Sequence, residues 1–172
     1  MMRKLMWLAL LTLVSAVAMA QTCVVEGAIG AGAAGAPDAD HPNAHFGLNV
    51  IHATCGDHEF QAGAFRFTTR QENRIVEIQM IRLARLEVDA EHHVAAFAGP
   101  AVITVRTREG VRHVRGIVSV QVRDSRPRGS EEGDPDAIGV QFFVPDRQDP
   151  VFTYRGVVRR GDILVFHHER SR

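Results

Sequence analysis

Apolar and polar residues alternate along most of the chain from about residue 43 onward, which is the pattern of strands that bury one face. In the segment from Phe60 to Thr69, for example, Phe65 and Phe67 share one parity and Arg66 and Thr68 share the other. Residues typical of turns separate such segments. The strands predicted in this way are Ala44 to Ala53, Phe60 to Thr69, His93 to Ala98, Ala101 to Thr107, Val114 to Arg123, Ala137 to Val144, Val151 to Tyr154 and Val157 to His167.

The stretch from Ile75 to Val88 is apolar at too many positions for one clean period. We interpret it as two β segments joined by a bulge or bend near Arg82. A helix is the alternative, because Leu, Ala, Arg, Glu and Met all tolerate helices well. The predicted breaks between strands are Gly99-Pro100, Glu109-Gly110, the polar loop from Asp124 to Asp136, Pro145 to Pro150, and a turn near Gly161-Asp162.

Taken together, the pattern predicts an all-β domain, a single antiparallel β-sandwich or barrel of about eight short strands. A parallel α/β fold would require helices between the strands. No such helical pattern is evident in the sequence.

The first twenty residues have the three parts of a cleaved signal peptide. Arg3 and Lys4 supply positive charge, Leu5 to Val17 is apolar, and Ala18 to Ala20 gives the small-x-small cleavage pattern. The apolar run is shorter than the roughly 20 residues that cross a bilayer, so no transmembrane segment is expected after cleavage. Cys23 lacks the small residues directly before it that lipid attachment requires. We therefore expect a secreted or periplasmic protein.

Residues 21–42 are rich in Gly and Ala and contain Pro37 and Pro42. They show neither a helical period nor a strand alternation, so we predict a flexible, exposed linker from Gly27 to Asp40. The predicted organisation is a signal peptide over 1–20, this linker over 21–42, and one β domain over 43–172.

Charge and cysteine content narrow the picture further. Without Arg3 and Lys4, 18 basic residues remain, all arginine, beside 20 acidic ones. This near-neutral balance argues against nucleic-acid binding, which needs clustered positive charge. Cys23 and Cys55 are the only cysteines, and an even number in an exported chain predicts one disulfide, which would fasten the N-terminal segment to the first strand.

Several short motifs resemble the post-COAP family of bacterial secreted domains. Asn43 to Val50 is similar to its "AxFGFNV" opening, Ala96 to Ala101 to its "A-x-F-x-G-x-A" hairpin, and Val118 to Gly129 to its "v-x-V-x-D-x-G-E-P-G" strand and loop. Gly133-Asp134 and Gly161 to Ile163 resemble two further elements. In the third motif Ser-Arg-Pro replaces Gly-Glu-Pro. The resemblance implies an exported β module that occurs beside other extracellular modules, with no assigned activity.

The loop from Asp124 to Asp136 is the best candidate for a metal site. Asp124, Asp134 and Asp136, with Glu131 and Glu132 nearby, gather the oxygen ligands that Ca²⁺ takes. The spacing is not that of an EF-hand, and Asp is also an ordinary turn residue. We favour turn formation and keep calcium as the alternative and as the one candidate cofactor.

No catalytic residue can be assigned, because the chain has neither a Gly-x-Ser-x-Gly elbow nor an HExxH motif. We predict scattered surface histidines rather than a zinc or copper site. The leading hypothesis is an exported, non-enzymatic β module that binds or scaffolds an unknown ligand at the cell envelope or outside it. The alternatives are an envelope-polymer hydrolase or lyase with a cleft site, and a periplasmic metal-binding protein. The histidines are His41, His45, His52, His58, His92, His93, His113, His167 and His168.

Overall fold

The computed structural model describes residues 22–39, 41–125 and 133–171. Within these ranges the chain forms antiparallel strands and no helix, which confirms the all-β prediction. None of these residues lies in a helix that is long and apolar enough to cross a membrane. The strands are β1 (Thr22–Gly35), β2 (Ala44–Cys55), β3 (His58–Gln71), β4 (Arg74–Met80), β5 (Arg85–Asp89), β6 (Val94–Thr107), β7 (Gly110–Arg123), β8 (Ala137–Phe143) and β9 (Phe152–Ser171).

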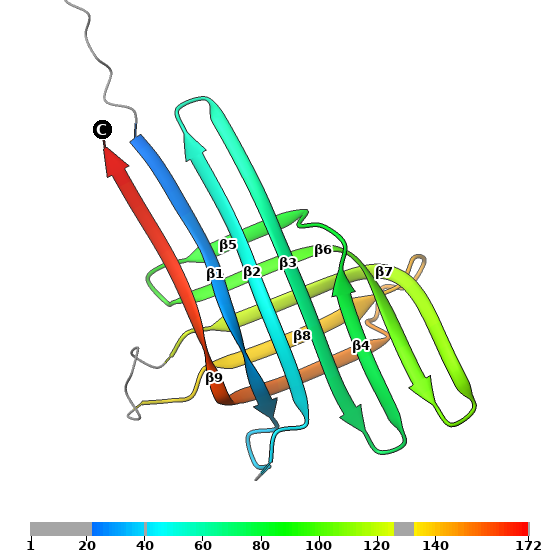
Figure 1. Cartoon of the computed structure of the whole chain (residues 1–172). Coiled ribbons are helices and arrows are strands. Elements are labelled where there is room, and N and C mark those ends of the chain that lie inside the picture. Colours follow the sequence, from blue (N-terminus) through cyan, green and yellow to red (C-terminus); the bar gives the residue numbers. More distant parts are fainter. Residues whose placement is uncertain (1–21, 40, 126–132, 172) are drawn as a thin grey trace, which may run out of the picture.

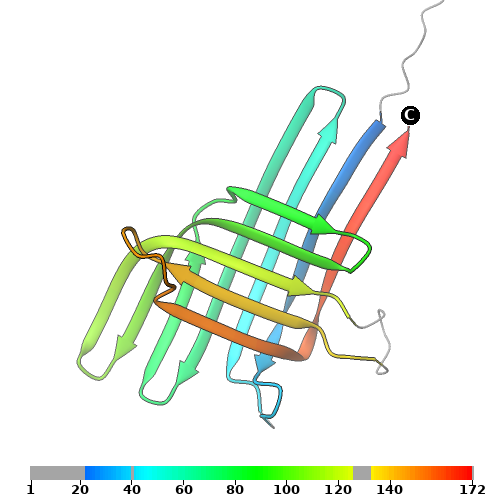
Figure 2. The ribbon, with the colours of Figure 1, turned by 180° about the vertical axis from the view of Figure 1, so that it is seen from behind.

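The strands form one sheet in the order β4-β3-β2-β1-β9-β8-β7-β6-β5, and an additional pairing of β4 with β6 closes it into a ring. Two long strands belong to both sides of the ring. β6 pairs with β5 over residues 94–98 and with β4 over 101–106, while β9 pairs with β8 over 152–157 and with β1 from residue 157 onward. The ring is therefore flattened into two layers whose strands cross, as Figures 1 and 2 show.

The core between the layers is built from the inward side chains of nearly every strand. At its centre, the rings of Phe65 and Phe97 meet edge to face with centroids 5.6 Å apart. The ring centroids of Phe67 and Tyr154 are 4.8 Å apart. These contacts join β3 of one layer to β6 and β9, which connect the two layers. Burial of such side chains stabilises the fold by about 1.5–3 kcal/mol each.

The predicted linker from Gly27 to Asp40 is wrong for most of its length. The structure places it in β1, in the middle of the sheet between β2 and β9. The small residues are required there, because a Cβ atom at Gly27 would overlap the carbonyl oxygen of Val50, and one at Gly32 would overlap that of Arg160. A strand made of Gly and Ala shows no apolar alternation in its sequence, although its neighbours are packed closely around it.

The predicted break at Gly99-Pro100 is also wrong, because β6 runs through it. Pro100 has no N–H to donate, but it lies between Ala98, the last residue paired with β5, and Ala101, the first paired with β4. Its carbonyl oxygen accepts a hydrogen bond from the N–H of Ile81 on that same side, at 2.8 Å. The missing donor therefore falls in the gap between two partner strands and removes no bond from the sheet.

The turn predicted near Gly161-Asp162 is instead the corner of β9. Ala33 and Ala34 of β1 pair with residues 160 and 158, so Arg159 forms a bulge. Gly161 has φ +93°, a value that L side chains rarely adopt. Bulge and glycine together let one strand pass from one layer to the other without ending. The two predicted segments within Ile75–Val88 are confirmed as β4 and β5, and the helical alternative is wrong.

The predicted disulfide between Cys23 and Cys55 is confirmed. The two residues are direct partners of β1 and β2, and their Cα atoms are 4.2 Å apart. Closing a loop of 32 residues in sequence separation stabilises the fold by about 4 kcal/mol in the chain-entropy model. The bond joins the start of β1 to the end of β2.

Tyr154 provides a spectroscopic test of the packing between the layers. Its hydroxyl donates a hydrogen bond to Oδ1 of Asn43 at 3.0 Å, and burial raises its pKa to about 12. As the only tyrosine in the chain, it should produce a tyrosinate absorbance step near pH 12 in the folded protein and near 10 in denaturant. Because the folded pKa is the higher one, its contribution to stability is complete below pH 10 and is lost as the pH rises towards 12.

The Tyr154→Phe variant is the control, since it should remove the absorbance step altogether. It should also lower the free energy of unfolding by about 1 kcal/mol through the lost hydrogen bond. A step near pH 10 in the folded wild-type protein would contradict the burial of this phenol.

Candidate functional site

Four strand ends extend beyond the ring as a sheet of their own, in the order β9-β1-β2-β3 (Figure 1). β4 pairs with β3 only from Arg66 onward, and β8 pairs with β9 only as far as Val157. The extension is thus covered neither by β4 nor by β8. We call it the projecting sheet and define it as residues 22–29, 49–55, 58–65 and 164–171.

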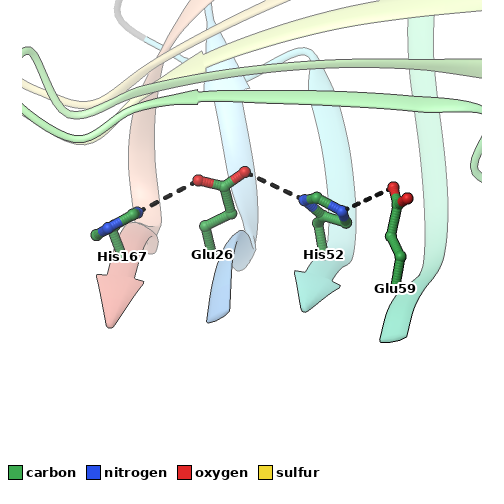
Figure 3. A network of polar contacts seen from close by, with 4 residues as sticks. All are labelled: Glu26, His52, Glu59 and His167. Carbon is green, nitrogen blue, oxygen red and sulfur yellow. Dashed lines mark hydrogen bonds and ion pairs between the residues drawn. The ribbon is translucent and has the colours of Figure 1, made fainter. Parts of the chain in front are cut away.

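A row of acidic and histidine side chains crosses the inner face of this sheet, as Figure 3 shows. Glu26 of β1 lies between His52 of β2 and His167 of β9, and each of its carboxylate oxygens is 3.3 Å from an Nδ1 atom of one imidazole. Nε2 of His52 is 3.0 Å from Oε1 of Glu59 on β3. We call these four residues the polar row.

The polar row begins where the hydrophobic core ends. Because side chains alternate along a strand, Glu26 points to the same side as Ala28. In the same way, His52 shares a face with Val50 and His167 with Val165. Ala28, Val50 and Val165 are all buried. Two positions from these buried residues, toward the tip of the projecting sheet, the same face carries carboxylates and imidazoles in place of aliphatic groups. The inner face is therefore apolar inside the ring and polar on the extension.

The four side chains are partly open to solvent, with exposed fractions of 22% for Glu26, 25% for His52, 39% for His167 and 71% for Glu59. Each contact is thus worth about 0.2–1 kcal/mol. A carboxylate beside a histidine is also what an acid–base catalyst needs. No group of three or more His, Cys, Asp or Glu side chains arranged to hold a metal ion occurs among the described residues.

The prediction of scattered histidines is wrong for His52 and His167, which share one carboxylate. Nothing in the sequence indicated this, because Glu26 lay in the segment 21–42, for which no strand was predicted, and the contact between β1 and β9 joins residues 141 positions apart. The prediction describes other histidines better. His45 is exposed on the opposite face of β2. The backbone N–H and ring of His92 hydrogen-bond to Asp89 and lower its pKa.

The outer face of the projecting sheet carries an exposed group of apolar side chains, which we call the apolar patch. Ile29 is 45% exposed and Phe60 59% exposed. Ala64 is exposed too, and the other members are partly buried. They share this face because they are strand partners, or alternate with them, in the register of β3, β2, β1 and β9. The patch consists of Val25, Ile29, Ile51, Ala53, Phe60, Ala62, Ala64, Leu164 and Phe166.

A shallow groove of about 760 Å³ continues the apolar patch towards the ring. Ile29 and Leu164 line one end of it, and Gly47, which has no neighbouring atom within 4 Å of a built Cβ position, leaves the other end open. Arg66 and Asp162, which also line the groove, place charges at its margin. The outer face therefore combines an apolar centre with a charged border.

Asp124 and Asp136, from the loop predicted as a metal site, have a structural role at the edge of β9 that faces away from β1. The Oδ2 atom of Asp124 accepts the backbone N–H of Val165 at 3.2 Å. Asp136, only 3% exposed, accepts the N–H of Ser125 on Oδ1 at 2.9 Å and that of Ile163 on Oδ2 at 3.0 Å. The two carboxylates thereby satisfy amides of β9 beyond the point where β8 has left it.

Of the other calcium candidates, Asp134 is exposed, and Glu131 and Glu132 lie outside the described residues. Burial raises the pKa of Asp124, with a further contribution from the nearby Asp136 carboxylate, while the hydrogen bond from Val165 opposes the shift. The calcium hypothesis stays a prediction. Asp124 and Asp136 already serve as acceptors for backbone amides.

Replacing Asp124 or Asp136 by asparagine should destabilise the protein to different degrees. Asp136 uses both oxygens, so Asp136→Asn leaves one amide without an acceptor and should lower the free energy of unfolding by about 1–3 kcal/mol. Asp124→Asn keeps the one oxygen that Val165 needs and should cost less than about 1 kcal/mol. Urea unfolding of the two variants measures the difference, and equal losses would contradict these roles.

The effect of calcium on the melting temperature tests the alternative role of this loop. If these carboxylates only hold β9, millimolar calcium should leave the melting temperature unchanged. A rise of several degrees that disappears in Asp134→Asn would instead establish a calcium site in this loop.

Comparison with known proteins found no matching family model, no matching curated protein and no matching solved structure. The resemblance to the post-COAP family therefore stays a prediction from the motifs.

Proposed function

We propose that this chain is an exported, non-enzymatic β module that binds another protein at the cell envelope or outside the cell, with the apolar patch as its binding surface. The observation that carries the proposal is the patch itself. It exposes Ile29 and Phe60 on the outer face of a regular sheet. A contiguous apolar surface rimmed by polar groups is typical of protein–protein contact sites.

The shape of the patch favours a protein over a small molecule. Sites for small ligands are concave and enclose most of the ligand, whereas this patch lies on one face of four neighbouring strands. The groove beside Gly47 is shallow and open along this same face, so apolar side chains of a partner could lie in it. Because about half of each side chain is already buried, covering the rest of Ile29 or of Phe60 would contribute about 1 kcal/mol to binding.

Export rests on two independent features. The N-terminal twenty residues have the composition of a signal peptide. The disulfide between Cys23 and Cys55 belongs to oxidising compartments, because thiols in the cytosol are kept reduced. Both support a secreted or periplasmic location.

Photo-cross-linking in the producing cell tests the binding surface. A photoreactive amino acid in place of Phe60 should give adducts that proteinase degrades and whose mass is not a multiple of this chain. The same amino acid in place of Ile117, 55% exposed on β7, is the matched control and should give none.

Ile29→Asp, in the chain that carries the photoreactive residue at position 60, should abolish these adducts. Val151→Asp, at a similarly exposed residue outside the patch, should preserve them. Equal adducts from positions 60 and 117, or adducts that survive Ile29→Asp, would refute the patch as a binding surface.

A second candidate function, an envelope-polymer hydrolase, is favoured by the polar row, in which the Glu26 carboxylate lies beside two imidazoles. We expect the purified protein to release no soluble fragments from isolated envelope polymer. Release that is lost in Glu26→Gln but kept in Glu59→Gln, a more exposed member of the row, would favour the hydrolase.

A further inference from the structure

The first half of β3 has a strand partner on one side only. β2 pairs with it from His58 onward, but β4 joins the other side only at Arg66. Residues 58–65 therefore form an edge of the projecting sheet (Figure 1). This edge contains no proline, and between Glu59 and Arg66 it contains no charged side chain.

The hairpin between β2 and β3 fixes which backbone groups face outward. Cys55 and His58 close a two-residue loop, so this pair and every second pair after it are hydrogen-bonded between the two strands. The residues between them, Glu59, Gln61 and Gly63, direct their N–H and C=O groups away from β2. The loop from β3 to β4 agrees, because its closing residue Gln71 has the same parity.

The opposite edge of the projecting sheet is protected. On β9, the amides of Ile163 and Val165 are accepted by Asp136 and Asp124. The strand then continues with charged and histidine side chains from His167 to Arg170. Charged and capped edges resist pairing with other chains, whereas an open edge of small and apolar residues invites it.

We propose that β3 pairs with β3 of a second copy of this chain, antiparallel across a two-fold axis perpendicular to the sheet. Such an axis keeps the inner faces of both copies on the same side, so residues of equal parity must face each other. Centred on Gln61, the register sets Glu59 opposite Gly63 and Phe60 opposite Ala62. Glu59 and Phe60 then each meet a small residue, Gln61 meets the uncharged Gln61 of the other copy, and no like charges are opposed.

This dimer stands apart from the proposed function, because it rests on the edge of β3 and not on the patch. It would bring the two apolar patches together on one continuous sheet of eight strands, since Phe60 of each copy lies next to Ala62 of the other. Assembly stops at two copies, because the β9 edge at each end is protected.

Sedimentation of the disulfide-bonded, exported chain tests the inference. The wild-type protein should shift from one copy to two as its concentration rises. Gln61→Lys places two ammonium groups opposite each other at the axis and should raise the dissociation constant by about tenfold or more. Gln79→Lys is the matched control, because Gln79 is also exposed but lies on a strand paired on both sides, and it should leave the dissociation constant unchanged.

Amide hydrogen exchange gives a second test that needs no variant. On raising the wild-type concentration, the amides of Glu59, Gln61 and Gly63 should exchange more slowly. Those of Phe60 and Ala62, already bonded to β2, should not change. A protein that stays monomeric throughout, which would leave this edge to a strand of another protein, overturns the proposal. Exchange that slows equally at all five of these amides would also overturn it.

Discussion

The passage of β9 from one layer to the other is the constraint on which the architecture depends. One strand has to pair with β8 and then with β1, and at the change of partner it loses the sheet on one side. The bulge at Arg159 and the positive φ of Gly161 permit the change of direction. The carboxylates of Asp124 and Asp136 replace the lost partner by accepting amides of β9. β9 thereby joins the two layers, and four strand ends are left to extend beyond the ring.

The inner face of the extension shows how one strand pattern can serve two environments. Glu26 and Ala28 are neighbours on the same face of β1, yet Ala28 is fully buried and the Glu26 side chain is 22% exposed. The alternation of the strand is unchanged across this boundary. What changes is the layer opposite, because the crossing strands cover one residue and not the other. A polar residue is stable there only because two imidazoles and solvent meet its carboxylate.

Strands with large apolar side chains were predictable because their alternation is visible, as in β3 with Phe65 and Phe67. β1 was not, since its Gly and Ala residues are chosen by the nearness of the backbones of β2 and β9, which a sequence does not display. For the same reason the polar row was missed, because Glu26 lay in that strand. The disulfide was predictable from two cysteines alone. The partners of Asp136 depend on the corner of β9, which no local pattern indicates.

The disulfide acquires a mechanical meaning from its position. Thr22 and Ser171 are register partners, so both ends of the described β structure leave the projecting sheet at the same tip (Figure 2). A force that pulled these ends apart would peel β1 from β9 one residue pair at a time, which is the direction in which a sheet resists least. Cys23 is only the second residue of β1, and its bond to Cys55 passes the load at once to β2. Tension would then act on two strands held as one unit, long before it reached the core.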